Sequence, residues 1–410
     1  MSMEKKLSIK DLDLKGKKVL IRVDFNVPME EDKITDDTRM RAALPTIRYA
    51  LDQGAAVILM SHLGRPEGTP DPRYSLAPCG QRLSELLSKP ILMARDCMGP
   101  EVQKMASQLK AGEVLLLENL RFHKGEEKPR EEPGFASALA QLGNVYVDDA
   151  FGCAHRSHAS ITTIAQFFPG KAAAGFLLEK EIEFLGRTLT NPQRPFIAIL
   201  GGAKVSTKFK IIEALMRKAD VLLIGGAMAN TFFKAEGYEI GDSLYEKDFI
   251  PVAKDILDVG NQSRCRIVLP VDVSAAKKVD SNSEKKVFSI SQGVPGGFQA
   301  LDIGPETVLK YAKELEKAAT VFWNGPLGVF EHPPFDKGTK DIALILAQLP
   351  CKTIVGGGDS VAAIEEAGVA DRMTHLSTGG GAALEFLEMG TLPGIEALSN
   401  AQNSKLNVNK

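Results

Sequence analysis

The sequence predicts an α/β protein with doubly wound, Rossmann-like parallel sheets that carry helices on both faces. Short apolar runs alternate with helix-length amphipathic segments along the chain, the pattern of strand–helix–strand units. Most runs are apolar almost throughout, as expected of strands covered on both faces. Glycine-rich turns follow several runs. The expected strands span residues 18–23, 55–60, 113–118, 144–149, 195–200, 220–225, 266–271, 320–323 and 352–355.

Chain length and one helix suggest how the domains divide. The chain has 410 residues, whereas a typical domain has about 150. Segment 177–192 reads as one charged amphipathic helix ended by Asn191-Pro192, and the chemistry of the turns changes across it. We therefore expect a connecting helix between a first domain, 1–176, and a second, 193–390. The polar tail 400–410 is expected to fray.

The composition and charge of the chain argue against some classes of partner and indicate where the protein is located. The net charge is −2, which argues against nucleic acid or an anionic membrane as a partner. No apolar run approaches the roughly 18 residues that a membrane span needs, and the N-terminus shows no secretory signal. Five scattered cysteines fit reduced thiols in a cytoplasmic protein. No histidine has a carboxylate or cysteine at metal-ligand spacing in the sequence, so His123 and His332 are expected to be structural.

Glycine-rich turns in the second half predict a polyphosphate site. They occur in "ILGGAK" (199–204), "LIGGAM" (223–228), "IVGGGDS" (354–360) and "STGGGA" (377–382). A helix that follows such a turn offers unpaired N–H groups to an anion, and glycine lets the backbone approach closely. A single glycine here could be an ordinary turn residue. Four such turns in one half of the chain favour a nucleotide.

Two kinds of charged side chain accompany these turns. Lys204 and Lys208, four residues apart, are expected on one side of the start of a helix over 205–218, within reach of phosphate oxygens, although a lone lysine is usually a solvated charge. Asp359 could hold Mg²⁺, which uses few protein ligands. Its alternative role is to cap a helix that starts at Ser360. The GxxxxGK[ST], GxGxxG, HRD and DFG motifs are absent from the sequence, which argues against the ATPase, dinucleotide and protein-kinase classes that they mark.

The first half predicts a pocket for an acidic ligand. Arginine suits carboxylate and phosphate because its guanidinium can donate two parallel hydrogen bonds. A single arginine near a strand end is usually a surface ion pair, but here four stretches follow predicted strands and would share one crevice. The residues in question are Asp24, Asn26, Arg39, His62, Arg65, Arg121, His155, Arg156 and His158.

These motifs together resemble the phosphoglycerate kinase family. They occur in family order from about Val23 to Leu398, and the ordered set is very specific. The resemblance implies two similar-sized domains facing each other across a cleft, with a C-terminal segment, about 391–400, returning to the first. The motifs are "RVDFNVP", "SHLGRP", "ENLRFH", "DDAFGCAHRSHAS", "GGAKVSTK", "WNGPLGVFE", "GGGDS" and "STGGGA".

The resemblance also assigns the ligands. The first domain would bind 3-phosphoglycerate or 1,3-bisphosphoglycerate, and the second Mg²⁺ with ADP or ATP, with Asp359 as the metal ligand. Arg39, Lys204, Gly358 and Gly380 would surround the phosphoryl group during transfer. The phosphoglycerate would contact Asp24, Phe25, Asn26, Arg39, His62, Leu63, Gly64, Arg65, Arg121 and Arg156. The nucleotide would contact Lys208, Asn324, Glu331, Gly356, Gly357, Gly358, Asp359 and Ser360.

The implied reaction is a reversible phosphoryl transfer between an acyl phosphate and ADP. Both nucleophiles are anionic at neutral pH, so charge neutralisation and alignment are required and a general base is not. Domain closure about 177–192 would exclude water. The resemblance implies a monomer. One departure from the family is Ala300, where many members have glycine against the adenine.

Two other functions share the predicted fold class. A nicotinamide-dependent dehydrogenase should carry GxGxxG and a ribose-binding acid, and the missing motif argues against it. A two-lobed binding protein would typically be exported and would not need Lys204 and Asp359 beside glycine-rich turns.

Overall fold

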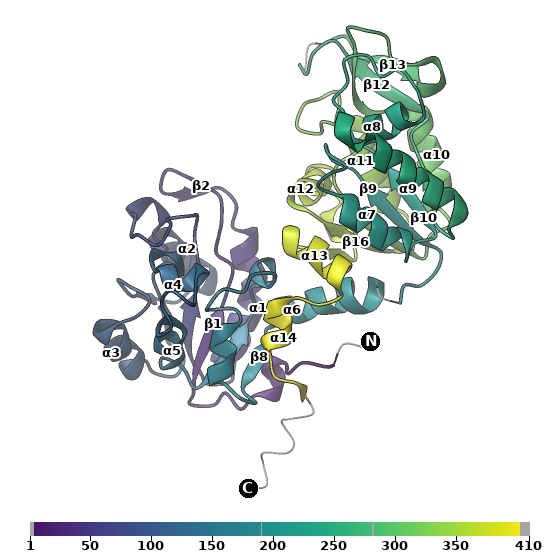
Figure 1. Cartoon of the computed structure of the whole chain (residues 1–410). Coiled ribbons are helices and arrows are strands. Elements are labelled where there is room, and N and C mark those ends of the chain that lie inside the picture. Colours follow the sequence, from purple (N-terminus) through teal and green to yellow (C-terminus); the bar gives the residue numbers. More distant parts are fainter. Residues whose placement is uncertain (1–3, 190, 281–282, 402–410) are drawn as a thin grey trace. The chain divides into compact units, whose positions relative to one another are not determined.

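The computed structural model contains two compact units, each built around its own parallel sheet (Figure 1). The structure describes residues 4–189, 191–280 and 283–401. One unit comprises Met1–Glu183 and Thr391–Lys410, and the other Phe184–Gly390. Among the described residues, each unit has one six-stranded sheet whose paired strands run parallel. The predicted α/β fold class is therefore confirmed.

The sheet of the first unit is covered on both faces. Strands β4 and β7 are buried along their whole length and β1 from Val19 onward, as expected of parallel strands that are covered on both faces. In spatial order the strands are β5 (Ile91–Met93), β6 (Val114–Leu116), β4 (Ala56–Met60), β1 (Lys18–Arg22), β7 (Val145–Asp148) and β8 (Ala172–Ala174). The helices of this unit are α1 (Thr38–Asp52), α2 (Ala77–Leu87), α3 (Pro100–Gln108), α4 (Lys124–Glu127), α5 (Phe135–Ala140), α6 (Phe176–Glu181) and α14 (Pro393–Ala397).

The second unit repeats this architecture. Its central strand β9 pairs with β10 on one side and β15 on the other. In spatial order the strands are β11 (Arg266–Val268), β10 (Val221–Ile224), β9 (Phe196–Leu200), β15 (Thr320–Asn324), β16 (Lys352–Gly356) and β17 (His375–Leu376). The helices are α7 (Phe209–Met216), α8 (Met228–Ala235), α9 (Ile250–Gln262), α10 (Pro305–Leu315), α11 (Lys337–Leu346), α12 (Gly358–Glu366) and α13 (Gly381–Met389).

Two antiparallel elements were not expected from the sequence. The second unit carries a three-stranded sheet of β13 (Lys286–Ser289), β12 (Asp272–Ala276) and β14 (Gln299–Ile303). The first has a short hairpin of β2 (Met29–Glu30) and β3 (Lys33–Ile34). Every predicted strand is present within a few residues, whereas the two- or three-residue strands β5, β8 and β17 are too short to show a periodic pattern.

Two helix predictions need correction. The helix expected over 205–218 begins only at Phe209 and ends at Met216, because the Ser206 and Thr207 side chains bond outside it, to Glu246 and to the Lys204 carbonyl. The connector expected over 177–192 begins at Phe176 as α6 and continues as a π-helix over Ile182–Thr188. Thr190 of that segment lies outside the described residues.

The described C-terminal residues return to the first unit. Asn400 forms a bridge with Lys6, and the Ala401 N–H donates to the Lys5 carbonyl at 2.8 Å. The predicted frayed tail over 400–410 is therefore paired at its first two residues, and 402–410 lie outside the described residues. In the described part of the chain, no helix combines the length and apolar character needed to cross a membrane.

Candidate active site

Four loops of the first unit meet at the carboxyl edge of its sheet. They follow β6, β4, β1 and β7, which are neighbours in this order. The chain leaves β1 toward β4 on one side and returns to β7 on the other, so β1 and β7 flank the point where the winding direction reverses. Open α/β sheets bind ligands at such a point. The acid-binding stretches predicted from the sequence lie on these four loops.

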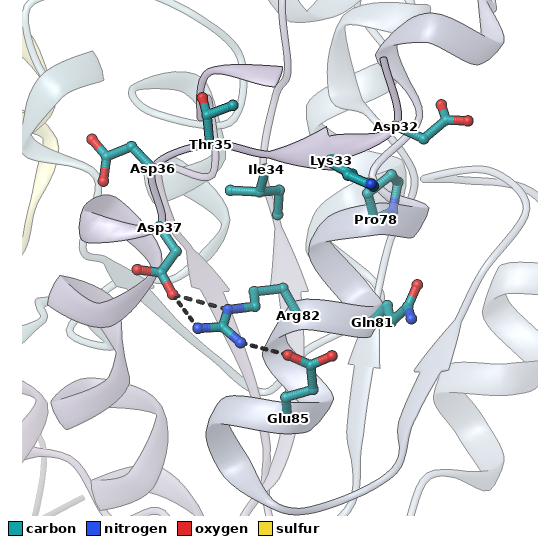
Figure 2. A pocket seen from close by; sticks show the side chains of 10 residues that line it. All are labelled: Asp32, Lys33, Ile34, Thr35, Asp36, Asp37, Pro78, Gln81, Arg82 and Glu85. Carbon is teal, nitrogen blue, oxygen red and sulfur yellow. Dashed lines mark hydrogen bonds and ion pairs between the residues drawn. The ribbon is translucent and has the colours of Figure 1, made fainter. Parts of the chain in front are cut away.

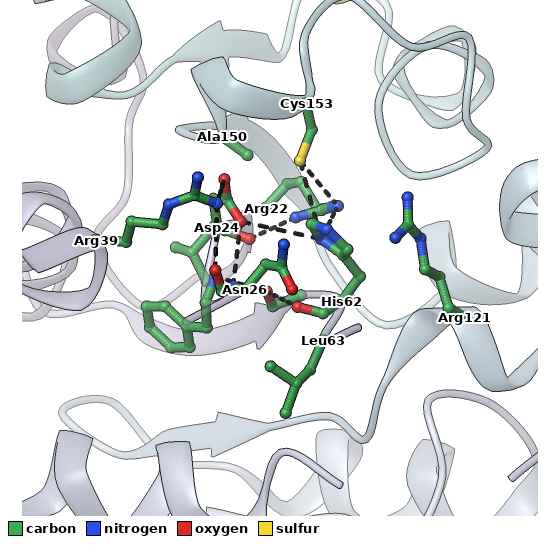
Figure 3. Close-up of polar contacts among 12 residues, drawn as sticks. Arg22, Asp24, Asn26, Arg39, His62, Leu63, Arg121, Ala150 and Cys153 are labelled. Atoms are coloured by element: carbon green, nitrogen blue, oxygen red, sulfur yellow. Dashed lines mark hydrogen bonds and ion pairs between the residues drawn. The ribbon is translucent and has the colours of Figure 1, made fainter. Parts of the chain in front are cut away.

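Arg39 is held beside the loop that follows β1. Its guanidinium donates to the Asp24 carboxylate at 2.8 Å and to the Asn26 carbonyl at 3.2 Å. The Asp24 carboxylate also accepts from the Asn26 N–H at 3.2 Å, which bends the loop in an Asx turn. Because Arg39 lies in the first turn of α1, these bonds join the helix start to the loop (Figure 3).

Gly64, on the loop after β4, links the loop after β1 to the loop after β6. Its N–H donates to the Asn26 side chain at 2.9 Å, and its carbonyl accepts from Arg121 at 2.8 Å. Arg121 belongs to the 3₁₀ turn η3 (Leu120–Phe122) after β6. Gly64 has a φ of +61°, and a Cβ there would lie 2.2 Å from the Tyr74 ring, so only glycine fits.

A buried arginine that sequence reasoning missed supports His62. Arg22 ends β1 with its side chain fully buried. Its guanidinium donates to Ser160 Oγ at 2.8 Å and lies 3.2 Å from His62 Nδ1 and 3.9 Å from the Glu126 carboxylate. Glu126 in turn accepts from the Ser160 N–H and Oγ at 3.0 and 2.7 Å. The available signal was a charged residue inside the apolar run "KVLIRV".

Burial keeps the His62 ring neutral, and Arg22 determines which of its nitrogens carries the proton. Burial, reinforced by the charges of Arg22 and Arg121, holds the pKa of His62 well below its usual range, so the ring is neutral at pH 7. A guanidinium can only donate hydrogen bonds. Nδ1 must therefore accept, and the proton resides on Nε2, where it can be donated to a ligand.

Two neighbours of His62 are also uncharged at neutral pH. Burial, with the charges of Arg121 and Arg22 as the next causes, lowers the pKa of His158 to about 3. Burial raises the pKa of the Cys153 thiol to about 12. The buried cationic charge of this region thus belongs to the guanidiniums, as a site for an anionic ligand requires.

The remaining predicted residues of the first unit divide into two groups. Phe25 and Leu63 bury their side chains in the core, so they can offer a ligand only backbone groups. Arg65 and Arg156 lie on the loops after β4 and β7 with exposed side chains. Within the described residues, the network around Arg39 and His62 does not include these two guanidiniums.

Ion pairs in a groove beside the site hold the start of α1 in place. The groove has a volume of about 520 Å³ and lies between the β2–β3 hairpin and α2 (Figure 2). In it Arg82 donates to the Asp37 carboxylate at 2.9 and 2.8 Å. Asp37 also accepts from Arg41 at 2.8 Å. These ion pairs fix the residues that precede Arg39.

The second unit gathers its glycine-rich loops in the same way. The winding direction reverses between β9 and β15, and Lys208, on the loop after β9, bonds to the side chain of Asn324 at the end of β15. Asn324 donates to the Gly356 carbonyl at 2.7 Å. A Cβ on Gly201 would lie 2.0 Å from the Pro326 carbonyl oxygen, so the close approach of these two loops requires glycine.

Helix α12 starts just after Gly356, whose carbonyl accepts the hydrogen bond from Asn324. It begins at Gly358, two residues before the position expected from the sequence, with Gly357 as its N-cap. Asp359 lies in the first turn and its side chain is exposed. Ser360 is buried, and its hydroxyl accepts from the Gly325 N–H at 2.6 Å, so it ties α12 to the loop after β15.

Burial and a carboxylate act in opposite directions on Lys208. Burial lowers the pKa of the Lys208 ammonium, and the charge of Asp359 partly offsets that effect. Lys204 and Glu331 are exposed on the loops after β9 and β15. Gly380, with a φ of +51°, is the N-cap of α13, so this helix also presents its N-terminus at the carboxyl edge of the sheet.

Comparison with known proteins gives one consistent family. The family model for phosphoglycerate kinase matches residues 9–390. The chain is 55% identical over 394 residues to the phosphoglycerate kinase of Moorella thermoacetica, covering 96% of this chain and 99% of the relative. It is 52% identical over 397 residues to that of Chlamydia felis, covering 96% and 98%.

Solved structures agree with the sequence comparisons. The fold is similar to that of phosphoglycerate kinase from Coxiella burnetii, with a TM-score of 0.86, 41% identity and coverage of 96% and 98% of the two chains. The enzyme from Pyrococcus horikoshii matches with a TM-score of 0.83, 36% identity and coverage of 98% and 99%. The chain therefore belongs to the phosphoglycerate kinase family, whose members reversibly transfer a phosphoryl group from 1,3-bisphosphoglycerate to ADP.

Proposed function

We propose that the loops of the first unit bind the phosphoglycerate and that the glycine-rich loops of the second bind the nucleotide. The observation that carries the first assignment is the donor cluster of Arg39, His62 and Arg121 around Gly64. It combines two guanidiniums with a neutral imidazole at the carboxyl edge of a parallel sheet. A small molecule with a carboxylate and a phosphate matches these donors.

Individual residues of this pocket take distinct parts. The Arg39 guanidinium, oriented by Asp24, would bind the reacting carboxyl end and neutralise charge on the transferred group. His62 would donate its Nε2 proton and Arg121 its remaining N–H groups. Arg121 Nε is buried and has no hydrogen-bond partner among the described residues, which favours an anionic ligand there. Asn26 and Gly64 supply the rigid backbone, and Arg65 and Arg156 would turn inward onto the ligand.

The nucleotide assignment depends on the helix starts of the second unit. The N-termini of α12 and α13 offer free N–H groups and a partial positive charge, which suit phosphates. Lys208, Asn324 and the run from Gly356 to Ser360 would line the phosphate site. Glu331 would accept hydrogen bonds from the ribose hydroxyls. Lys204 would reach the transferring phosphoryl group together with the N–H groups near Gly358 and Gly380.

We assign the magnesium ion to Asp359. Its carboxylate is exposed in the first turn of α12, so it can join nucleotide phosphates and water in the octahedral shell that Mg²⁺ prefers. When bound, the ion would neutralise phosphate charge. Lys208, whose ammonium lies near Asp359, would hold the phosphates beside it.

The transfer needs alignment rather than proton removal. The carboxylate of 3-phosphoglycerate and the β-phosphate of ADP are both anionic at neutral pH, so neither needs a base. His62, neutral and donating from Nε2, therefore serves in binding. Direct transfer also requires the two bound ligands to meet, and we assign the necessary pivot to the 177–192 segment, which includes the π-helix Ile182–Thr188.

We further propose that the chain works as a monomer in the cytoplasm. All five cysteines are free thiols, which fits a reducing compartment. Light scattering during size-exclusion chromatography would test the monomer, because a dimer would double the measured mass.

A coupled assay tests the proposed function. With 3-phosphoglycerate and Mg-ATP, the purified chain should form 1,3-bisphosphoglycerate, which an auxiliary dehydrogenase consumes at the expense of NADH. Omitting either substrate or chelating the magnesium should stop the reaction. An inactive, folded chain that binds neither ligand by calorimetry would refute the assignment.

A further inference from the structure

A second cluster of potential ligand side chains lies apart from the network around Arg39. The Asp96 carboxylate, the Cys97 thiol and a His123 ring nitrogen lie within 4.8 Å of one another. Asp96 and Cys97 follow β5, whereas His123 follows η3. The sequence separates them by more than 25 residues, so their spacing could not reveal the cluster.

The His123 ring is held in a fixed orientation. Its Nε2 lies 2.7 Å from the Asp96 carboxylate, and Phe135 packs against the ring with centroids 5.4 Å apart. On the other side, Nδ1 lies 3.9 Å from the Glu132 carboxylate. Glu132 is itself fixed, because it accepts from the Gly125 N–H at 3.0 Å. A histidine with one nitrogen toward a ligand set and the other toward a carboxylate is a common arrangement in metal sites.

We propose that Asp96, Cys97 and His123 Nε2 form a binding site for a zinc-like divalent cation. One oxygen, one sulfur and one nitrogen donor suit Zn²⁺, which takes such mixed sets in tetrahedral geometry, with water in the fourth position. Magnesium prefers oxygen ligands alone, so this site is chemically distinct from the one assigned to the nucleotide.

The surroundings of the cluster favour a cation. The Glu132 carboxylate faces the His123 ring at 3.9 Å, and the Asp96 carboxylate accepts from the Cys97 N–H at 2.6 Å. The side chains of His123 and Asp96 are 23% and 49% exposed, so an ion can enter from solvent. Arg95 and Lys124, the basic residues next in sequence to the ligands, have exposed side chains.

A similar donor set in the pocket around Arg39 has surroundings that disfavour a cation. Asp24, His62 and Cys153 also lie within 4.8 Å of one another. There, however, Arg22 lies 3.2 Å from His62 Nδ1 and 3.7 Å from the Cys153 sulfur, and Arg39 pairs with Asp24 at 2.8 Å. These guanidiniums already contact the three donor side chains and repel a second cation.

Metal binding must displace one proton. A cysteine thiol is protonated at neutral pH without metal, because its ordinary pKa is about 8.5, and it binds a metal as the thiolate. On binding, the S–H bond breaks, a sulfur–metal bond forms, and the proton passes to water. The hydrogen bond between Asp96 and His123 opens as both side chains turn to the ion. The proton on His123 Nε2 passes through water to Nδ1, which faces Glu132, so that Nε2 presents its lone pair to the metal.

Cobalt provides a direct probe, because a thiolate bound to Co²⁺ gives a charge-transfer absorption. The full-length chain without nucleotide is titrated with Co²⁺, and Zn²⁺ is then added in competition. We expect one ion per chain, a thiolate–cobalt band, and its removal by zinc. Cys97→Ser should abolish the band. Glu132→Gln should weaken zinc binding by about 10–100-fold while the band persists, as for other outer partners of metal-bound histidines.

Variants of other cysteines make the result specific. Cys79→Ser removes another buried thiol and should leave the band unchanged, with circular dichroism verifying the fold of each variant. A chain that gives no thiolate–cobalt band would overturn the proposal. So would a band that survives Cys97→Ser. If such a band were lost in Cys153→Ser, the metal would lie in the pocket around Arg39.

Discussion

The guanidinium of Arg39 lies 2.8 Å from the carboxylate of Asp24, which joins the first turn of α1 to the loop that ends β1. The pair leaves Arg39 partly exposed, with 36% of its side chain accessible, so the guanidinium is aimed but still available to a ligand.

Replacing Arg39 with alanine should lower kcat about 10²–10³-fold, because the variant loses a preorganised cation at the transferred group. The free energy of unfolding should change by only about 1 kcal/mol, since the ion pair is partly exposed. Steady-state kinetics and urea unfolding measure the two effects. Arg48→Ala, on the same helix but exposed and bonded to the Leu86 carbonyl, is the matched control and should keep normal turnover. Near-normal kcat in Arg39→Ala would exclude the catalytic role.

Two lysines on one loop should differ in their effects. Lys204→Ala should lower kcat about 10²-fold with little change in ADP affinity, because its exposed ammonium meets only the transferring group. Lys208→Ala should weaken Mg-ADP binding about tenfold or more, since a charged donor to phosphate is lost. Calorimetry beside kinetics separates these outcomes. Lys210→Ala, in a surface pair with Glu388, is the control. Equal loss of affinity in both lysine variants would contradict the division of roles.

Neutralising Asp359 should act through the metal. Asp359→Asn should reduce the gain in ADP affinity that Mg²⁺ normally provides, because the carboxylate ligand is lost. Binding of metal-free ADP should be unchanged or slightly tighter, since a negative charge near the phosphates is removed. ADP titrations with magnesium and with a chelator measure both. Glu366→Gln, at the opposite end of α12, should behave as the unaltered chain. An undiminished magnesium effect in Asp359→Asn would place the ion elsewhere.

His158 should make the ligand-free protein acid-sensitive. Its pKa is about 3 when folded, against about 6.5 when unfolded. Above pH 6.5 neither state binds the proton, so His158 contributes nothing to the pH dependence. As pH falls below 6.5, only the unfolded chain binds it, so the free energy of unfolding should fall by about 2 kcal/mol between pH 7 and 5 from this group.

Two histidine replacements test this predicted fall in the free energy of unfolding between pH 7 and pH 5. Urea unfolding at pH 7 and pH 5 should show a smaller fall for His158→Gln than for the unaltered chain. His332→Gln should show the same fall as the unaltered chain, because the replaced side chain is exposed and the buried His158 is left in place. Identical pH dependence in all three proteins would contradict the assigned effect of burial on His158.

The sequence predicted the parts of this molecule that depend on local pattern. Buried parallel strands are continuous apolar runs, so β1, β4, β9 and β15 could be located. Parallel strands bring their carboxyl ends to one edge, so the loops that carry Asp24, His62 and Arg121 could be expected to meet.

Contacts between distant residues could not be predicted in this way. Arg22 contacts Ser160, which is 138 residues away, and nothing local to "KVLIRV" specifies that partner. The start of α7 depends on Glu246 bonding to Ser206, and the cluster of Asp96, Cys97 and His123 depends on two strand ends being neighbours in the sheet. Such features follow from tertiary packing rather than from sequence period.

Hydrogen–deuterium exchange with each ligand alone tests the central assignment most directly. With 3-phosphoglycerate, we predict slower exchange in 22–28, 61–66 and 119–123, and unchanged exchange in the glycine-rich loops. With Mg-ADP, we predict slower exchange in 201–208 and 356–360. Protection of the glycine-rich loops by 3-phosphoglycerate, with no protection of the loops around Arg39, would contradict the account.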